Sequence, residues 1–490
     1  MPLRVRDAVL LACLLGAPVR AILGQCPDGT PAPCRGVQPG PPGLVIVPFE
    51  NRSRDTADAY LAAALSDDIT EAFASSHAVR LLSPRGGRGR EAYRLSGGVQ
   101  RIGDVVRVAV RLERPSSGEI VWTRSLDVPA ARSAEAATEI ARGALASMRV
   151  STAGAVRTPA RPVDPAAYDL YLRGRYFASR RVEAAIQQAV ALFRQAVGRD
   201  STFALAWSGL ADALHYALRW RLSVPGLPAD SLPAAILRAS ERALLADSAQ
   251  AEIWVARADA LQDVDPTSRA PSIRALERAI ALDSLDASTW ALLAFTLDEA
   301  GDTSGAMRAY RHSLALDPLN PLTLSNISLH FYWQGRDDSA MAWADSTVAA
   351  DPTYISGRRI AGTVALSLGR WTDAETQFEA ARTVGPGPER IWAMAGLAVV
   401  AVARGDSARA RALSGQMEAM TDASQPALHS AVFIAWALAA LGERDRALAW
   451  LERYGPVRDL HFQQHLRGDG PLAPLRADPR FQALLTGQGP

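Results

Sequence analysis

Few residues of this chain have the types and spacing that catalysis or metal binding requires. His461 and His465 are four residues apart, so on a helix both imidazoles would lie on one face, where they could bind a metal ion. The glutamate of a His-Glu-x-x-His motif is absent between them, and we therefore predict two surface histidines and no metal site. Asp67 and Asp68 are adjacent carboxylates, but on an amphipathic helix we expect them to form a solvated edge.

The basic residues exclude several enzyme classes. All 53 of them are arginine, against 51 acidic residues. Without lysine, the chain cannot be a P-loop nucleotidase, a protein kinase or a Schiff-base enzyme. The arginines and glycines between Arg85 and Arg94 could contact phosphate, but the strand-glycine-helix context is missing, and we predict a solvated loop. A net charge of +2 gives no general attraction to nucleic acid. We predict no enzymatic activity, no cofactor and no nucleic-acid partner.

A 34-residue period between Trp290 and Trp392 is the clearest pattern in the chain. Three sets of residues recur at this spacing, namely Gly301, Gly335 and Gly369, then Ala306, Ala340 and Ala374, then Pro318, Pro352 and Pro386. A period of this length is typical of a helix-turn-helix solenoid, in which glycine ends the first helix and proline follows the second. Such an array presents an extended curved surface for binding, not a closed catalytic pocket.

These residues resemble the tetratricopeptide repeat (TPR). The match extends in both directions from the central units, which gives about eight units over 167–456. The resemblance implies an all-α solenoid whose inner helices line a concave face that binds protein.

A second module is predicted over 44–150. Apolar runs and alternation predict strands over 44–49, 79–82, 93–102, 105–113 and 119–128, with helices over 57–75 and 134–148. Val106, Val108 and Val110 alternate with Arg107 and Arg111, which indicates a sheet with one exposed face. The element order describes a small α/β sandwich, so the chain as a whole is α+β.

This module resembles the TolB amino-terminal-like domain, which precedes TPR arrays in many bacterial proteins. The likeness rests on 47–51, 65–70, 96–99 and 118–122, and 478–481 looks like the closing motif of such chains. Relatives often carry an output domain in front of this module. About 43 residues precede the first strand here, too few for such a domain, so we expect the sensing or scaffolding part alone.

The first 24 residues have the basic start and short apolar run of a signal peptide, which predicts export to the periplasm or cell envelope and no transmembrane span in the mature chain. An uncleaved anchor is the alternative. A Pro/Gly-rich leader follows over 25–43, in which we expect Cys26 and Cys34 to form a disulfide, with two free thiols as the alternative. Residues 151–166 are predicted as a linker and 457–490 as a C-terminal cap.

These features favour a non-catalytic scaffold that binds a peptide or protein in the TPR groove. The inner-helix positions change from acidic to apolar along the array, and two arginines are expected to bind carboxylates of the partner. The predicted groove residues are Asp212, His215, Glu252, Asp259, Gln262, Phe295, Leu329, Tyr332, Arg359, Leu366, Arg390, Leu397 and Val400. Alternatively, the tail over 471–485 covers the apolar part, or those residues are core. A periplasmic sensor that binds a small ligand in the α/β module is the other function considered.

Overall fold

A computed structural model describes residues 41–82, 91–129, 132–150, 163–384, 390–421, 427–454 and 459–487. The predicted signal peptide, Cys26 and Cys34, the loop from Arg85 to Arg90 and most of the predicted linker lie outside the described residues. Within the described ranges, no helix has both the length and the apolar character needed to cross a membrane.

The N-terminal module is a mixed sheet with two helices. Its elements are β1 Gly43–Ile46, β2 Glu50–Asn51, α2 Ala59–Ala74, β3 Arg80–Leu82, β4 Tyr93–Ile102, β5 Val105–Arg114, β6 Glu119–Pro129 and α3 Ser133–Met148. The strands are ordered β3-β1-β4-β5-β6, with the short β2 beside β4. β1 is parallel to β3 and β4, whereas β4, β5 and β6 are antiparallel neighbours.

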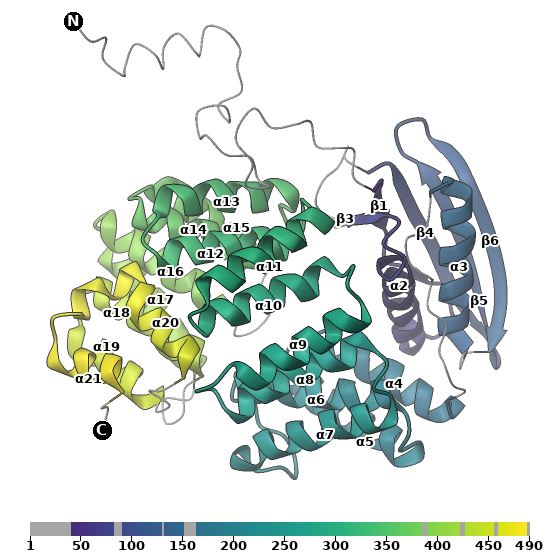
Figure 1. The fold of residues 1–490 in the computed structure, drawn as a ribbon, viewed down its shortest axis with the longest axis horizontal. Coiled ribbons are helices and arrows are strands. Elements are labelled where there is room, and N and C mark those ends of the chain that lie inside the picture. The colour runs from purple at the N-terminus through teal and green to yellow at the C-terminus, as the bar shows by residue number, and fades with distance from the viewer. Residues whose placement is uncertain are drawn as a thin grey trace, which may run out of the picture.

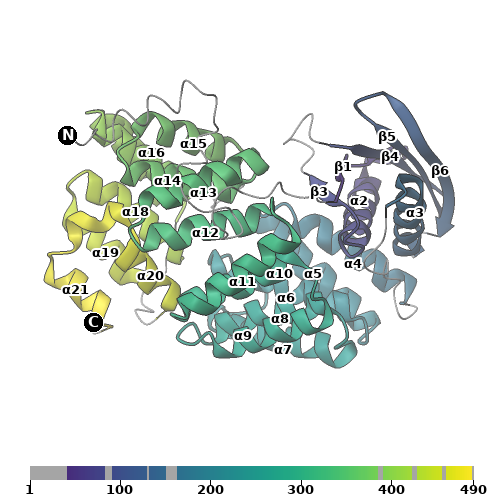
Figure 2. The same cartoon turned by 45° about the horizontal axis from the view of Figure 1, so that its top comes forward.

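One face of this sheet is covered and the other is open to solvent, as predicted. Along β5, Val106, Val108 and Val110 are buried and alternate with more exposed residues. Helices α2 and α3 lie side by side against the sheet (Figure 1, Figure 2). The buried Ser66 Oγ on α2 accepts a hydrogen bond of 2.8 Å from the backbone N–H of Phe49, which joins two of the sequence motifs noted above.

The solenoid consists of paired helices, α4 to α19, of which consecutive members form eight pairs within the described residues. Their bounds are α4 Pro165–Ala178, α5 Glu183–Arg199, α6 Ala204–Arg219, α7 Leu232–Ala246, α8 Ala251–Val264, α9 Ala270–Leu282, α10 Ala287–Glu299, α11 Thr303–Leu316, α12 Pro321–Trp333, α13 Asp337–Ala350, α14 Ile355–Ser367, α15 Trp371–Val384, α16 Arg390–Ala403, α17 Ser407–Ala419, α18 Leu428–Ala440 and α19 Arg444–Tyr454.

The three repeated glycines and Pro318 have the local roles that their spacing predicted, whereas Pro386 lies outside the described residues. Gly301, Gly335 and Gly369 adopt positive φ angles of 86°, 70° and 67° at the turns between paired helices, a conformation that glycine tolerates best. Asp317 ends α11, and its carboxylate accepts a hydrogen bond of 3.1 Å from the N–H of Leu319, just after Pro318.

The C-terminal segment folds back into the concave side of the solenoid. It contains α20 Leu460–Gly468, the short helix η6 Gly470–Leu475 and α21 Pro479–Thr486. The N–H of Leu460 donates to Pro266 O at 3.1 Å, and that of Gly470 donates to the Tyr332 hydroxyl at 3.0 Å. Figure 1 shows this yellow segment beside α10 and α12.

The α/β module and the solenoid are joined through α2 and α4. Asp68 is buried, and its carboxylate pairs with Arg175 on α4 at 2.5 Å and accepts from the Tyr168 hydroxyl at 3.3 Å. Arg173 lies over the ring of Tyr60, 5.0 Å from its centroid. The predicted solvated edge is therefore wrong for Asp68, because α4 of the other module covers it, whereas the Asp67 side chain stays 58% exposed.

Candidate functional site

The concave side of the solenoid encloses a cavity of about 1190 Å³. Its wall is built from helices α4, α6, α8, α10, α12, α14, α16 and α18, the first members of the helix pairs, together with α2 and the tail helix α20. Segments at both ends of the solenoid help to enclose the cavity. The α/β module forms one wall and the C-terminal tail forms another. The expected curved surface is thus a partly enclosed cavity.

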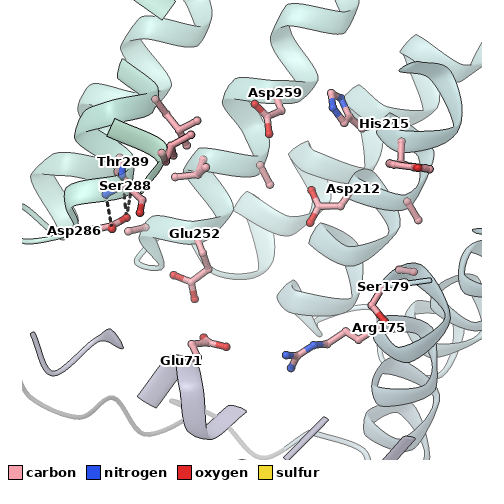
Figure 3. A pocket seen from close by; sticks show the side chains of 18 of the residues that line it. Glu71, Arg175, Ser179, Asp212, His215, Glu252, Asp259, Asp286, Ser288 and Thr289 are labelled. Carbon is pink, nitrogen blue, oxygen red and sulfur yellow. Dashed lines mark hydrogen bonds between the residues drawn. The ribbon is translucent and has the colours of Figure 1, made fainter. Parts of the chain in front are cut away.

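One end of the cavity is strongly acidic. Nine carboxylates and four arginines line the cavity as a whole. The carboxylates are Asp68, Glu71, Asp200, Asp212, Asp247, Glu252, Asp259, Asp283 and Asp286. In Figure 3, Glu71 on α2 and Glu252 on α8 point into the same space, with the Arg175 guanidinium beside them. The surplus of negative charge in a concave wall focuses an attractive field on cations.

The carboxylate of Asp212, at this end, has a strongly raised pKa. Its side chain is open to the cavity, yet protein surrounds the cavity on most sides. This enclosure and the neighbouring charge of Asp259 raise its pKa to about 7, and His215 opposes the shift. Figure 3 shows Asp212 and His215 on one helix, α6, and Asp259 on the neighbouring helix α8. Asp212 therefore changes charge near neutral pH.

The opposite end of the cavity is aromatic. Phe295 and Leu329 line it, with Trp392 stacked on Phe433 at a centroid distance of 4.8 Å. The Arg359 guanidinium lies 4.9 Å from the centroid of the Trp392 ring. This end combines apolar area with the positive charges of Arg359 and Arg219, in contrast to the acidic end.

Three histidines meet beside this aromatic end. His461 and His465 on α20 lie close to His429 on α18, with ring centroids 5.4 Å and 5.8 Å from that of His429. The prediction of two surface histidines is wrong, because the tail carries α20 into the interior, where His465 is 4% exposed.

Buried carboxylates accompany two of these histidines. His465 Nδ1 lies 2.7 Å from Asp469 Oδ2, and His461 Nδ1 lies 2.7 Å from Glu299 Oε1. Glu299 also pairs with Arg269 at 2.7 Å. Burial alone would raise the pKa of Glu299. The interactions with His461 and Arg269 are stronger than this effect, so the pKa of Glu299 is below its usual value.

Burial keeps two of the histidines neutral. It lowers the pKa of His429 well below the ordinary value, and the Arg219 guanidinium acts in the same direction. Burial also lowers the pKa of His461, although Glu299 opposes the shift. At neutral pH both imidazoles therefore have a nitrogen lone pair available.

The structure brings seven of the thirteen predicted groove residues to the cavity wall. These are Asp212, His215, Glu252, Asp259, Phe295, Leu329 and Arg359. Tyr332, Leu366, Leu397 and Val400 are buried instead, so their expected place on an open groove is corrected. Leu366, Leu397 and Val400 belong to the core between helix pairs, and the tail covers Tyr332. Arg390 is exposed at the start of α16, and neither it nor Gln262 is among the residues that line the cavity.

Several residues of the cavity were not predicted from the sequence. Glu71 and Arg175 reach it from the junction of the two modules, and Trp392 and His429 reach it from the last pairs. The i, i+4 spacing of His461 and His465 was a usable signal, but nothing in the sequence connects them to His429.

Comparisons with known proteins give only distant likenesses. No protein-family model matches the chain, and no curated protein matches its sequence. Among solved structures, a monomeric mutant of IFIT1 with Gppp-AAAA is 14% identical, with coverage of 73% of this chain and 77% of that one and a TM-score of 0.43. Yeast Tom70 is 13% identical, with coverage of 68% and 69% and a TM-score of 0.42. PilF of Pseudomonas aeruginosa is 16% identical, with coverage of 46% and 93% and a TM-score of 0.33. These neighbours contain TPRs, and the solenoid of this chain is defined by its own repeated helix pairs.

Proposed function

We propose that this protein is a non-catalytic scaffold that binds an extended or helical peptide segment of a partner protein inside the cavity. Cationic side chains of that segment occupy the acidic end, and apolar side chains contact Phe295, Leu329 and Trp392. The observation that carries the proposal is the division of one cavity into an acidic and an aromatic end. This division matches a peptide that carries both kinds of side chain.

The size and charge of the cavity support this ligand class. Pockets for drug-sized molecules span about 300–1,000 Å³, and the cavity here reaches about 1190 Å³. The surplus of carboxylates repels phosphate groups, which disfavours nucleic acid as the ligand. Arg359 at the aromatic end remains suited to a single carboxylate of the peptide.

For the α/β module we propose a TolB amino-terminal-like identity and a supporting role. Its helix α2 supplies Glu71 to the cavity, and the Asp68–Arg175 pair fixes α2 against the solenoid. The sensor alternative, with a small ligand in the module itself, is distinguished by thermal shift against a small-molecule panel. A ligand bound to the module at many times its dissociation constant raises the melting temperature, whereas the scaffold shows no shift.

We further propose that the protein acts in the bacterial cell envelope after removal of its signal peptide, with a disulfide between Cys26 and Cys34. The basic, then apolar start of the chain supports export, and export supports disulfide formation. Mass spectrometry of the native protein tests both points. Retention of Met1, or alkylation of both thiols without prior reduction, contradicts them.

Photo-crosslinking tests the proposed binding site. A photoreactive residue in place of Leu292, which lines the cavity from α10, should capture partner peptides that contain lysine or arginine. The matched control carries the same residue in place of His312, which is exposed on α11 and outside the cavity lining. Equal capture at both positions, or captured peptides without basic residues, contradicts the proposal.

A further inference from the structure

The three histidines at the aromatic end form a nitrogen-rich cluster that the peptide-binding function does not require. One ligand nitrogen from each of His429, His461 and His465 can be chosen so that all three lie within 4.8 Å of one another. All three residues also line the cavity. The cluster joins the last helix pair to the tail helix, so it forms only when the tail is folded back.

Carboxylates orient two of the rings from behind. Asp469 accepts from His465 Nδ1 at 2.7 Å, and it also accepts from Trp436 Nε1 at 3.2 Å. A proton on Nδ1 leaves Nε2 of His465 as a lone-pair donor. Glu299 lies equally close to His461 Nδ1, but the N–H direction is far from linear, so it orients that ring less firmly.

Three nitrogens of the cluster are buried without a hydrogen bond. They are His429 Nδ1, His461 Nδ1 and His465 Nε2, and none of them has a hydrogen-bond partner among the described residues. A buried polar atom without a partner is costly, and a bound ion is one way to satisfy it. The pattern of a histidine held by a carboxylate on one side and free on the other is the arrangement found around metal ligands in proteins.

We propose that His429, His461 and His465 bind a divalent transition-metal ion, with Zn²⁺ as the first candidate. Imidazole nitrogens suit zinc and its neighbours in the first transition row, whereas magnesium and calcium prefer oxygen. Three histidines leave a fourth position, which faces the cavity and can take water or a donor atom of a bound molecule. This inference does not depend on the identity of the peptide partner.

Distances and charges set the conditions for binding. Zn–N bonds of about 2.0–2.1 Å place tetrahedral ligand nitrogens about 3.4 Å apart. The ligand nitrogens must therefore approach one another by up to about 1.4 Å from their present separation of up to 4.8 Å. Arg219 and Arg359 act on His429 with positive charge, while Glu299 and Asp469 bring negative charge behind the other two rings. Metal binding at this site would therefore depend more on the three nitrogen ligands than on negative charge around them.

Titration of chelator-treated, full-length protein with Zn²⁺ in competition with a chromophoric chelator tests the site. We expect one ion per chain in the wild type and at least about a hundredfold weaker binding in His429→Gln. Asp469→Asn keeps the hydrogen-bond geometry but removes the charge behind His465, and it should weaken binding by about 10–100-fold. The matched control is His312→Gln, an exposed histidine on α11 that should bind as the wild type does.

Co²⁺ provides a second measurement that needs no variant. The wild type with one equivalent of Co²⁺ should show the visible absorption bands of nitrogen coordination, and Zn²⁺ should remove them. If His429→Gln does not fold, this spectrum alone decides the question. The absence of these bands, or equal Zn²⁺ affinity in His429→Gln, His312→Gln and the wild type, overturns the proposal.

Discussion

The rings of Trp220, directly after α6, and His429 on α18 lie with their centroids 5.8 Å apart, although α6 belongs to the second helix pair and α18 to the last. The array therefore turns far enough for its two ends to meet. The tail then packs inside this turn, through the contacts of Leu460 with Pro266 and of Gly470 with Tyr332. A partner can reach the acidic and aromatic surfaces within one cavity.

The Asp68–Arg175 pair should stabilise the junction between the modules. Asp68→Asn removes the nearer charged partner of the partly buried Arg175 guanidinium and leaves it only Asp67, at 3.6 Å, as an ion-pair partner. Loss of one member of a buried pair costs about 3–5 kcal/mol. Because the Arg175 side chain is 22% exposed, we expect a smaller loss of about 2 kcal/mol in the unfolding free energy, measured by urea denaturation. The control is Arg107→Gln. The pair between Arg107 and Asp127 is solvent-exposed, so this substitution should leave stability unchanged. Equal stability of both variants contradicts this role.

Leu397 tests the corrected groove assignment. Its side chain is 1% exposed, in a cluster with Leu366 and Phe378. Leu397→Ala should lower the unfolding free energy by about 2–5 kcal/mol, because it leaves a cavity in the core. Peptide affinity should not change. A variant with wild-type stability and weakened peptide binding would restore Leu397 to the binding surface.

Tyr332 should stabilise the fold by holding the C-terminal tail, and it should not contact the peptide partner. Tyr332→Phe removes the hydroxyl that accepts the Gly470 N–H at 3.0 Å and leaves that donor unpaired. We expect a loss of about 1–2 kcal/mol in unfolding free energy. Tyr176→Phe removes a hydroxyl that contacts only the surface residue Arg180 among the described residues, so it is the matched control. Loss of peptide binding at unchanged stability would contradict this interpretation.

Asp212 should make both stability and binding depend on pH. Its pKa is raised to about 7 from an ordinary 3.8, so the folded state favours the protonated form. Its contribution to stability is therefore complete below pH 3.8 and is lost as the pH rises through 7. Urea denaturation at pH 5 and pH 8 should show a smaller decline in Asp212→Asn than in the wild type. Identical declines contradict the assignment.

The titration of Asp212 should also change the affinity for cationic peptides, which should rise with pH whereas the stability falls. If the ionised carboxylate binds the cation, affinity should rise about tenfold between pH 6 and pH 8 as Asp212 with a pKa of about 7 loses its proton. Comparison of Asp212→Asn with the wild type measures the effect of this carboxylate, because only the part of the pH dependence that Asp212 causes should disappear in the variant.

Local patterns in the sequence predicted much of the fold. Strand 93–102 was predicted with the bounds that the structure has, and the three glycines at 34-residue spacing end helices as expected. These features depend on neighbouring residues, through side-chain alternation or backbone conformation. Local information is enough to specify them.

The candidate site was predictable only in part, because it depends on contacts between distant segments. Asp68 is buried by α4, and His461 and His465 are buried by the return of the tail toward α18. Leu366 and Leu397 satisfy the groove spacing, yet they lie in one buried cluster with Phe378 of α15. Helix periodicity identifies a face of a helix but does not determine what covers it.

Selection from a random peptide display library on the full-length protein tests whether the cavity binds a cationic peptide segment. We expect enrichment of sequences that combine lysine or arginine with apolar residues, and loss of that enrichment on the Asp212→Asn/Asp259→Asn double variant. The folded state of the variant is checked by its melting temperature, and His312→Gln is the control that should select the same sequences as the wild type. Failure to enrich any sequence, or enrichment of acidic sequences that the double variant still selects, contradicts the proposal that this cavity binds a cationic peptide segment.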